Sequence, residues 1–423
     1  MSEVYTACNP PTGAGEAHDA ALDRVYHACA QTNGLNPTMF PSLRRMENEA
    51  ISSVAWMLKA PRDAVGALTS GGTESILMAI KAYRELARQK RPWVREPEVL
   101  MPITVHPAFE KACHYFGVKA VHVPVERSLG MRPDVRKAEA LLTRNTILIV
   151  GSAPQYAHCV VDPIEELGAL AERHGLPLHV DACYGGFVLP WLERNGASLP
   201  AWDFRVPQVT SISADFHKYG FAEKGASAVL FRDAALRQHM YYSYSRWPGG
   251  IYVSPSMAGT RPGGAVACAW AALRLMGVDG YRRVARELQA ACDTMIEGVT
   301  KAGLVLLAPP QTVGFAFEST DRKVDILAVA DAMETRGWKM ERQQDPPCLH
   351  CSVMPMHVAT APQFAADIQA ATDEVRAGKP PPEEGSAALY GMMANIPDKS
   401  IVDEFTRDLL GKLYTYAPPK AGE

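Results

Sequence analysis

Short apolar runs alternate with helical patterns through the middle of this 423-residue chain, and this alternation limits the possible folds. Runs typical of buried strands lie at residues 120–125, 146–150, 177–180, 209–212 and 226–231. Amphipathic patterns typical of helices lie at residues 73–89, 108–116 and 163–174. Strands separated by helices predict an α/β fold, with a mostly parallel sheet and helices on both of its faces.

The pattern changes to α+β after a long helix predicted over residues 278–302. Beyond it, strand-like and helical segments are predicted at residues 312–318, 324–335, 349–354, 362–377 and 400–414. We therefore predict an N-terminal segment (1–50), a large α/β domain (51–302) and a smaller C-terminal α+β domain (303–423).

Charge and hydropathy argue against several classes of protein. The 43 Lys and Arg residues against 46 Asp and Glu give a net charge of −3, whereas nucleic-acid binders usually carry a basic face. The first residues, MSEVYTACNPPTGAGE, lack the basic and apolar regions of a signal peptide. No run of 18 apolar residues occurs, so we expect no transmembrane segment and a cytoplasmic protein.

The nine cysteines are scattered, which is typical of reduced thiols in a chain of this length. Cys348 and Cys351 have the spacing of half a zinc site, but His357 is the one obvious further ligand nearby. The alternative is a β-strand, in which Cys348 and His350 face one way while Leu349 and Cys351 face the other. The strand is the favoured interpretation.

Polar residues follow several of the predicted strands, where ligands bind in an open α/β sheet. The turn TSGGTE (69–74) precedes a helix and can offer backbone N–H groups to an anion, although alone it reads as an ordinary helix cap. Asp181 can bind a metal, act as a base or pair with a protonated ring nitrogen, or it can merely cap the next turn.

Lys218 and His106 also follow strand-like runs. A desolvated lysine can form a Schiff base with a carbonyl, although most lysines are simply solvated. A histidine in this place can stack on a ring or transfer protons, or it can be structural. The glycine turn, Asp181 and Lys218 together supply what pyridoxal 5'-phosphate needs: an anion site, a partner for its pyridinium nitrogen and a lysine.

Longer motifs extend this pattern over nearly the whole chain. They are TSGGTES (69–75), HPAFEKA (106–112), GSAPQY (151–156), HVDACYGGF (179–187), SADFHKYGFAEKG (213–225), WPGGIYVSPSMAGTRPGG (247–264) and GSAALYG (385–391). In these motifs the sequence resembles the sphingosine-phosphate lyase branch of the fold-type I pyridoxal-phosphate enzymes, close to the group II decarboxylases.

The resemblance implies a role for each matching residue. Lys218 would carry the cofactor, Asp181 would pair with its pyridinium nitrogen, and His106 would stack on its ring. The loop 247–250 would reach the cofactor phosphate of a neighbouring subunit, which implies a homodimer with shared active sites. The positions assigned to the cofactor are Gly72, Thr73, His106, Asp181, Cys183, His217, Lys218 and Gly250.

Further matches concern the substrate. Tyr5 and Lys224 match positions that bind the substrate phosphate, and Tyr156 matches a catalytic tyrosine near the reacting carbon. Asn36 stands where the family usually has a histidine that contacts this phosphate. An asparagine can still donate hydrogen bonds, but it has no cationic form.

The predicted function is that of a pyridoxal-phosphate-dependent aldehyde-lyase. It would cleave the Cα–Cβ bond of a phosphorylated β-hydroxy amine to an aldehyde and phosphoethanolamine. An amino-acid α-decarboxylase is the alternative, because it would use the same glycine turn, histidine, aspartate and lysine; Lys224 and the GTRPGG run favour the lyase. A third, non-enzymatic hypothesis is a metal-linked binding module using Cys348 and Cys351.

Overall fold

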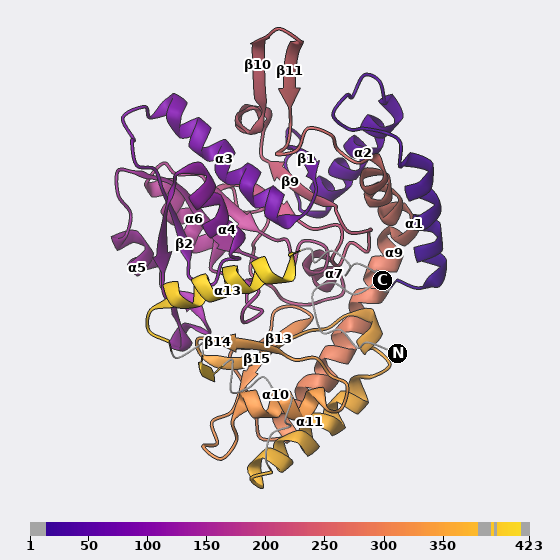
Figure 1. The fold of residues 1–423 in the computed structure, drawn as a ribbon, viewed down its shortest axis with the longest axis vertical. Helices are drawn as coiled ribbons and strands as arrows, with labels where there is room; N and C mark the ends of the chain where they lie inside the picture. The colour runs from indigo at the N-terminus through magenta and orange to yellow at the C-terminus, as the bar shows by residue number, and fades with distance from the viewer. Residues whose placement is uncertain (1–13, 380–390, 393–395, 416–423) are drawn as a thin grey trace, which may run out of the picture.

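A seven-stranded sheet in the order β1-β9-β8-β7-β6-β2-β3 forms the centre of the larger part of the molecule. The computed structural model describes residues 14–379, 391–392 and 396–415 (Figure 1). In this sheet β9 runs antiparallel to both of its neighbours, and the remaining pairs are parallel. The predicted α/β fold with a mostly parallel mixed sheet is confirmed.

The strands of the larger part are β1 (Val65–Thr69), β2 (Glu98–Pro102), β3 (Lys119–Val123), β4 (Val125–Glu126), β5 (Arg132–Pro133), β6 (Thr146–Ser152), β7 (Leu178–Asp181), β8 (Val209–Ala214), β9 (Ser227–Phe231), β10 (Tyr242–Trp247) and β11 (Gly250–Ser254). Its helices are α1 (Glu16–Cys29), α2 (Pro41–Met57), α3 (Gly72–Lys90), α4 (Ala108–Phe116), α5 (Val135–Ala140), α6 (Ile164–Arg173), α7 (Leu189–Arg194), α8 (Ala234–Arg237) and α9 (Gly263–Lys301).

Helices cover both faces of the sheet because its central strands are apolar on both sides. In β2, Val99 and Met101 belong to one core cluster with α3 and α4, whereas Leu100 belongs to another with α6, α7 and α9. Every residue of β6 is buried, as is usual for a strand inside a parallel sheet. This two-sided burial explains the continuous apolar runs of the sequence.

The long helix α9 begins earlier than the sequence pattern predicts. It covers Gly263–Lys301, and its backbone kinks at Gly277, where φ is 57°. Glycine has no Cβ and adopts this left-handed conformation readily. The predicted start at residue 278 coincides with the kink, and the alanine-rich residues before it are helical as well.

The C-terminal part is an antiparallel sheet with two helices, one packed on the sheet and the other packed between that helix and α9. Its strands, in the order β12-β13-β15-β14, are β12 (Val305–Leu306), β13 (Gly314–Glu318), β15 (Pro347–Ser352) and β14 (Glu341–Gln344). The packed helices are α10 (Ile326–Glu334) and α11 (Ala361–Arg376), and α13 (Lys399–Leu413) follows. The predicted division after residue 302 falls just beyond α9, whereas the one after residue 50 falls inside α2.

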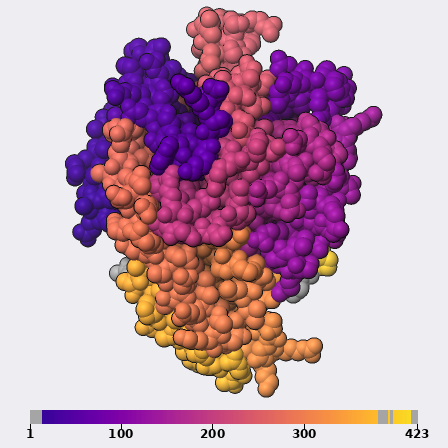
Figure 2. Space-filling model, turned by 180° about the vertical axis from the view of Figure 1, so that it is seen from behind, coloured from indigo at the N-terminus to yellow at the C-terminus, as the bar shows by residue number. Residues whose placement is uncertain are grey.

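The β10–β11 hairpin projects from the body at the top of Figure 1, and Figure 2 shows it standing clear from behind. Its strands pair with each other in a sheet of their own. Large apolar side chains on it are exposed, among them Ile251 at 77% and Trp247 at 55%. Within the described residues, no helix has the length and apolar character that crossing a membrane requires.

Candidate active site

The carboxyl ends of β1, β2, β6, β7 and β8 meet at one edge of the large sheet, and the residues that follow them line a cavity of about 400 Å³. Its lining is Ser70, Gly71, Gly72, Thr73, Glu74, Ile76, His106, Ser152, Pro154, Tyr156, Asp181, Cys183, Tyr184, Asp215, His217 and Lys218. The structure therefore brings together most of the residues that the sequence predicted for the cofactor.

The glycine turn between β1 and α3 forms one wall of this cavity. A Cβ added at Gly72 would lie 2.8 Å from Asp215 Oδ2 and 3.0 Å from Cys183 Sγ, so a larger residue would displace these groups. Helix α3 begins at Gly72, and its first backbone N–H groups have no acceptor within the helix. The helix dipole adds a partial positive charge, so this wall suits a phosphate.

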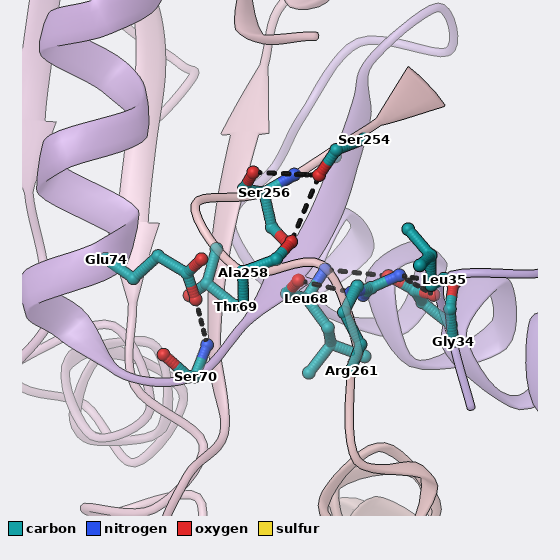
Figure 3. Close-up of polar contacts among 12 residues, drawn as sticks. Gly34, Leu35, Leu68, Thr69, Ser70, Glu74, Ser254, Ser256, Ala258 and Arg261 are labelled. Atoms are coloured by element: carbon teal, nitrogen blue, oxygen red, sulfur yellow. Dashed lines mark hydrogen bonds and ion pairs between the residues drawn. The ribbon is translucent and has the colours of Figure 1, made fainter. Parts of the chain in front are cut away.

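Buried side chains hold the turn in place. Glu74, 9% exposed, accepts hydrogen bonds from the backbone N–H of Ser70 (2.6 Å) and from that of Met257 (2.8 Å). The first of these contacts is drawn in Figure 3. Glu74 thus links the glycine turn to the loop that leads out of the β10–β11 hairpin.

Arg261 joins the N-terminal segment to the same region (Figure 3). Its guanidinium donates to Glu47 Oε1 (2.5 Å), to the backbone oxygen of Leu68 (2.9 Å) and to that of Gly34 (3.3 Å). Arg261 is 8% exposed. Charge-assisted contacts of this kind fix the end of β1, where the glycine turn begins.

Asp181 stands at the end of β7 and is 6% exposed. Its Oδ1 accepts from the hydroxyl of Ser213 (3.0 Å) and from the backbone N–H of Cys183 (3.0 Å). The Ser213 hydroxyl also lies 3.3 Å from Nε2 of the fully buried His179, whose pKa burial lowers to about 4. These contacts hold an acidic side chain at the floor of the cavity, where it can pair with a protonated ring nitrogen.

Lys218 and Asp215 come from the loop after β8. Lys218 Nζ lies 2.9 Å from Asp215 Oδ2, and the aspartate side chain is 1% exposed. Burial opposes ionisation of Asp215, but the charges of Lys218 and His217 outweigh it and hold its pKa below the ordinary value. The loop thus keeps an amine inside the cavity beside a carboxylate.

Burial opposes protonation of the two predicted histidines. Burial lowers the pKa of both His106 and His217. His106 Nδ1 accepts from the backbone N–H of Ala108 (3.1 Å), which orients the ring toward the cavity that it lines. His217 Nδ1 is buried without a hydrogen-bond partner in the described structure, while Nε2 lies 3.7 Å from Asp215 Oδ2.

Tyr156 lines the cavity from the loop after β6, and the C-terminal part of the molecule contacts it from behind. Its hydroxyl donates to Oε2 of Glu341, the first residue of β14. Its ring centroid lies 4.3 Å from that of the fully buried His350 in β15, with the planes tilted by 32°. Tyr156 is thus one of the points at which the C-terminal sheet meets the cavity.

The remaining predicted positions lie apart from the cavity lining or outside the described residues. Lys224 donates to the backbone oxygen of His217 (3.1 Å), so it sits beside the cavity. The Asn36 side chain accepts from Thr38 Oγ1 (2.8 Å) within its own turn, away from this lining. Gly250 lies in the projecting hairpin, and Tyr5 falls outside the described residues.

The two cysteines proposed as metal ligands lie in β15, as the strand interpretation requires. Burial raises the pKa of the Cys348 thiol to about 12 and that of Cys351 further, which disfavours the thiolates that zinc requires. Among the described residues, no group of three or more His, Cys, Asp or Glu side chains is arranged to hold a metal ion.

The cavity fits pyridoxal 5'-phosphate. The helix start at Gly72, where a Cβ would clash, and the orphaned Nδ1 of His217 suit an anion. The buried carboxylate of Asp181 suits a pyridinium nitrogen, and the Lys218 amine beside Asp215 suits a carbonyl. The sheet and this cavity define a fold-type I enzyme that depends on pyridoxal phosphate.

The comparisons with known proteins agree. The pyridoxal-dependent decarboxylase conserved domain matches residues 16–314. The sphingosine-1-phosphate lyase of Dictyostelium discoideum is 38% identical over 408 residues, which are 96% of this chain and 76% of that protein. The rat sphingosine-1-phosphate lyase 1 is also 38% identical, over 95% of this chain and 70% of its own. The chain belongs to the sphingosine-1-phosphate lyase branch of the pyridoxal-dependent decarboxylase family.

Solved structures show the same relationship. The sphingosine-1-phosphate lyase of Burkholderia pseudomallei superimposes with a TM-score of 0.87 at 36% identity, covering 97% of this chain and 90% of that one. The glutamate decarboxylase of Lactobacillus brevis superimposes with a TM-score of 0.74 at 22% identity, covering 84% and 86%. The second comparison shows a shared fold.

Several residues of the site were not singled out from the sequence, among them Asp215 and Glu341. Asp215 is part of the quoted motif around Lys218, and a carboxylate three residues before a predicted cofactor lysine was the available signal. Glu341 carries no such signal, because it meets Tyr156 across 185 residues of sequence.

Proposed function

We propose that this protein is a pyridoxal-phosphate-dependent aldehyde-lyase that cleaves the Cα–Cβ bond of a phosphorylated β-hydroxy amine of the sphingosine 1-phosphate type. The products would be a long-chain aldehyde and phosphoethanolamine. The observation that carries the proposal is that Lys218, Asp181 and His106 line one cavity in a chain 38% identical to sphingosine-1-phosphate lyases over nearly its whole length.

In this reaction pyridoxal 5'-phosphate accepts the electrons of the bond broken at Cα. Lys218 would hold the cofactor through its side-chain amine. Asp181, oriented by Ser213, would keep a proton on the ring nitrogen. His106, whose pKa burial lowers, would contact the ring, and the turn at Gly72 and Thr73 would bind the phosphate together with His217.

The substrate phosphate would lie beyond the cofactor, near Lys224. That exposed lysine stays close to the cavity through its bond to the His217 backbone, and its charge suits a phosphate. Tyr5 and Asn36 are proposed to contribute from the N-terminal segment. The Asn36 side chain closes its own turn in the single chain, so a contact with the phosphate would come from its N–H₂ group.

The active form is proposed to be a homodimer with shared active sites. Support comes from the projecting β10–β11 hairpin, whose exposed apolar side chains are of the kind that interfaces bury. Gly250, with φ 116°, lies at the turn of this hairpin. It would enter the cofactor site of the second subunit.

We place the enzyme in the cytoplasm. All eight described cysteines are free, and seven of them are buried, as expected where thiols stay reduced.

The alternative reaction is amino-acid α-decarboxylation, which the same lysine, aspartate and histidine can support. The glutamate decarboxylase described above shares this fold, but the relatives described above at 38% identity over most of the chain are sphingosine-1-phosphate lyases. The metal-linked module is disfavoured by the buried, protonated thiols of Cys348 and Cys351.

A substrate panel tests the proposal. Phosphorylated long-chain bases, short hydroxy amines and amino acids are incubated with the holoenzyme, and aldehyde and carbon dioxide are both measured. Aldehyde from the phosphorylated bases, absent with Lys218→Ala, is the expected result. Carbon dioxide from an amino acid without aldehyde from any base would establish the decarboxylase instead.

A further inference from the structure

The carboxylate of Glu341 lies behind Tyr156 and has no role in the function proposed above. Tyr156 lines the cavity, whereas Glu341 is not part of the lining and contacts the phenol from the C-terminal sheet. A half-buried carboxylate bonded to a cavity-lining hydroxyl is placed to accept a proton from it.

We propose that Glu341 is a proton acceptor that acts through Tyr156 on the β-hydroxyl of the substrate. The inference rests on the proposed lyase function. The O–H bond of the substrate breaks and its proton passes to the Tyr156 oxygen, while the phenol's own proton passes to Glu341 Oε2. The Tyr156–Glu341 pair thereby changes from a charge of −1 to 0, and the substrate oxygen gains the negative charge.

Cleavage of the Cα–Cβ bond completes the proposed reaction. The substrate oxygen forms the carbonyl of the aldehyde as the Cα–Cβ bond breaks, and the cofactor accepts the electrons of that bond. Glu341 returns its proton to solvent or to the product between turnovers. In this role Tyr156 touches the substrate, and Glu341 is a positioning and proton-accepting residue behind it.

The surroundings of Glu341 favour uptake of a proton. Burial raises its pKa, which the bond from Tyr156 and the charge of Lys339 oppose only in part. His350 and Cys351, on the paired strand β15, are both uncharged near neutral pH because burial lowers the pKa of the first to about 4 and raises that of the second.

The remaining charge next to Glu341 in sequence is directed elsewhere. Arg342 donates to Asp331 (2.5 Å) and to Glu334 (2.7 Å) on α10. The ionisable and charged groups around Glu341 on its own segment and on β15 are Lys339, Arg342, His350 and Cys351. The Tyr156 loop adds Tyr156 itself, and His158 and Cys159, which lie close to His350. The packing of the Tyr156 ring against His350 fixes the phenol, so the pair keeps one geometry.

Glu341→Gln tests the inference because it keeps the shape of the side chain and removes its basicity. The wild-type holoenzyme must first release aldehyde from a phosphorylated β-hydroxy amine; failure there would overturn the proposed function itself. In the variant, kcat should then fall on the order of 10²-fold with little change in KM. Glu341→Asp should recover part of that loss, and Glu374→Gln, a carboxylate in α11 bonded to Arg336 and Lys379, should behave as wild type.

Three further readouts separate proton transfer from a merely structural role. The wild-type kcat should decline on the acid side, as Glu341 becomes protonated, and the variant should lack this decline. Exchange of the Cα hydrogen of a phosphorylated amine without the hydroxyl should be equal in both, because it needs no hydroxyl proton transfer. In cofactor-free protein, the ionisation of the Tyr156 phenol is obtained by subtracting the titration of a Tyr156→Phe variant. This phenol should ionise at lower pH in Glu341→Gln than in the wild type.

The inference would be overturned by any of three results. They are a variant with wild-type kcat and pH profile, a variant whose Cα exchange falls as much as its lyase activity, and an unchanged ionisation of Tyr156. Each is distinct from a wild-type enzyme that makes no aldehyde.

Discussion

Lys218 Nζ and Asp215 Oδ2 lie 2.9 Å apart at the floor of the cavity, and the Asp215 side chain is 1% exposed. Because the same carboxylate lies 2.8 Å from where a Cβ of Gly72 would be, the lysine, the glycine turn and β8 are packed around one buried charge. The pair therefore links the stability of the cofactor-free protein to the geometry of its proposed site.

Asp215→Asn should lower the free energy of unfolding of the cofactor-free protein by about 3 kcal/mol near neutral pH, because Lys218 loses its partner. The folded-state pKa of Asp215 is depressed, so its contribution is present above the ordinary carboxyl pKa of 3.8 and is lost as pH falls through the folded value. Denaturant unfolding at several pH values measures this. Asp373→Asn, at an exposed position of α11, is the control; equal pH dependence of wild type and Asp215→Asn would contradict the prediction.

Lys218→Ala should give a protein without covalently held cofactor. The wild type should be yellow with added pyridoxal 5'-phosphate and should gain the cofactor's mass after borohydride reduction, whereas the variant should do neither. Lys224→Ala, which changes a lysine six residues away, should keep both properties. Reduction that labels the Lys218→Ala variant to the wild-type extent would show that another lysine carries the cofactor.

Lys224→Ala should raise KM for the phosphorylated substrate about tenfold with a smaller effect on kcat, since it removes one charge-assisted contact. The same substitution should leave the KM for a dephosphorylated base unchanged. Steady-state kinetics with the matched pair of substrates make the measurement. An equal rise in KM for both substrates would mean that Lys224 does not bind the phosphate.

Ile251→Asp should dissociate the proposed dimer, because it puts a charge on a side chain that is 77% exposed in the single chain and is predicted to be buried in the interface. Trp93→Asp, which changes a 66% exposed apolar residue between α3 and β2, should leave the oligomer intact. Sedimentation at several concentrations distinguishes the two. Activity should fall with dissociation and return when the protein is concentrated.

The sequence predicted the central strands because their burial leaves an unmistakable pattern. β6 and β9 are buried on both faces and appear as continuous apolar runs, and the cofactor residues follow such runs directly. The strand β1 was not predicted, because VGALT is short and contains two small residues, although the turn after it was identified.

The features that the sequence could not predict depend on contacts between distant segments. The β10–β11 hairpin pairs with itself and carries apolar residues outward, so its pattern does not resemble that of a buried strand. Glu341 reaches Tyr156 only through the packing of the C-terminal sheet on the large domain. The residue roles at the site remain predictions that the substitutions above test.

The most direct test of the lyase assignment is a mass balance in deuterium oxide. The holoenzyme is incubated with a phosphorylated long-chain β-hydroxy amine, and both products are quantified by mass spectrometry. The account predicts equal amounts of aldehyde and phosphoethanolamine, with a single deuterium on the carbon that was bonded to the carbinol. An enzyme that releases no aldehyde from such a substrate, yet forms carbon dioxide from an amino acid, would contradict it.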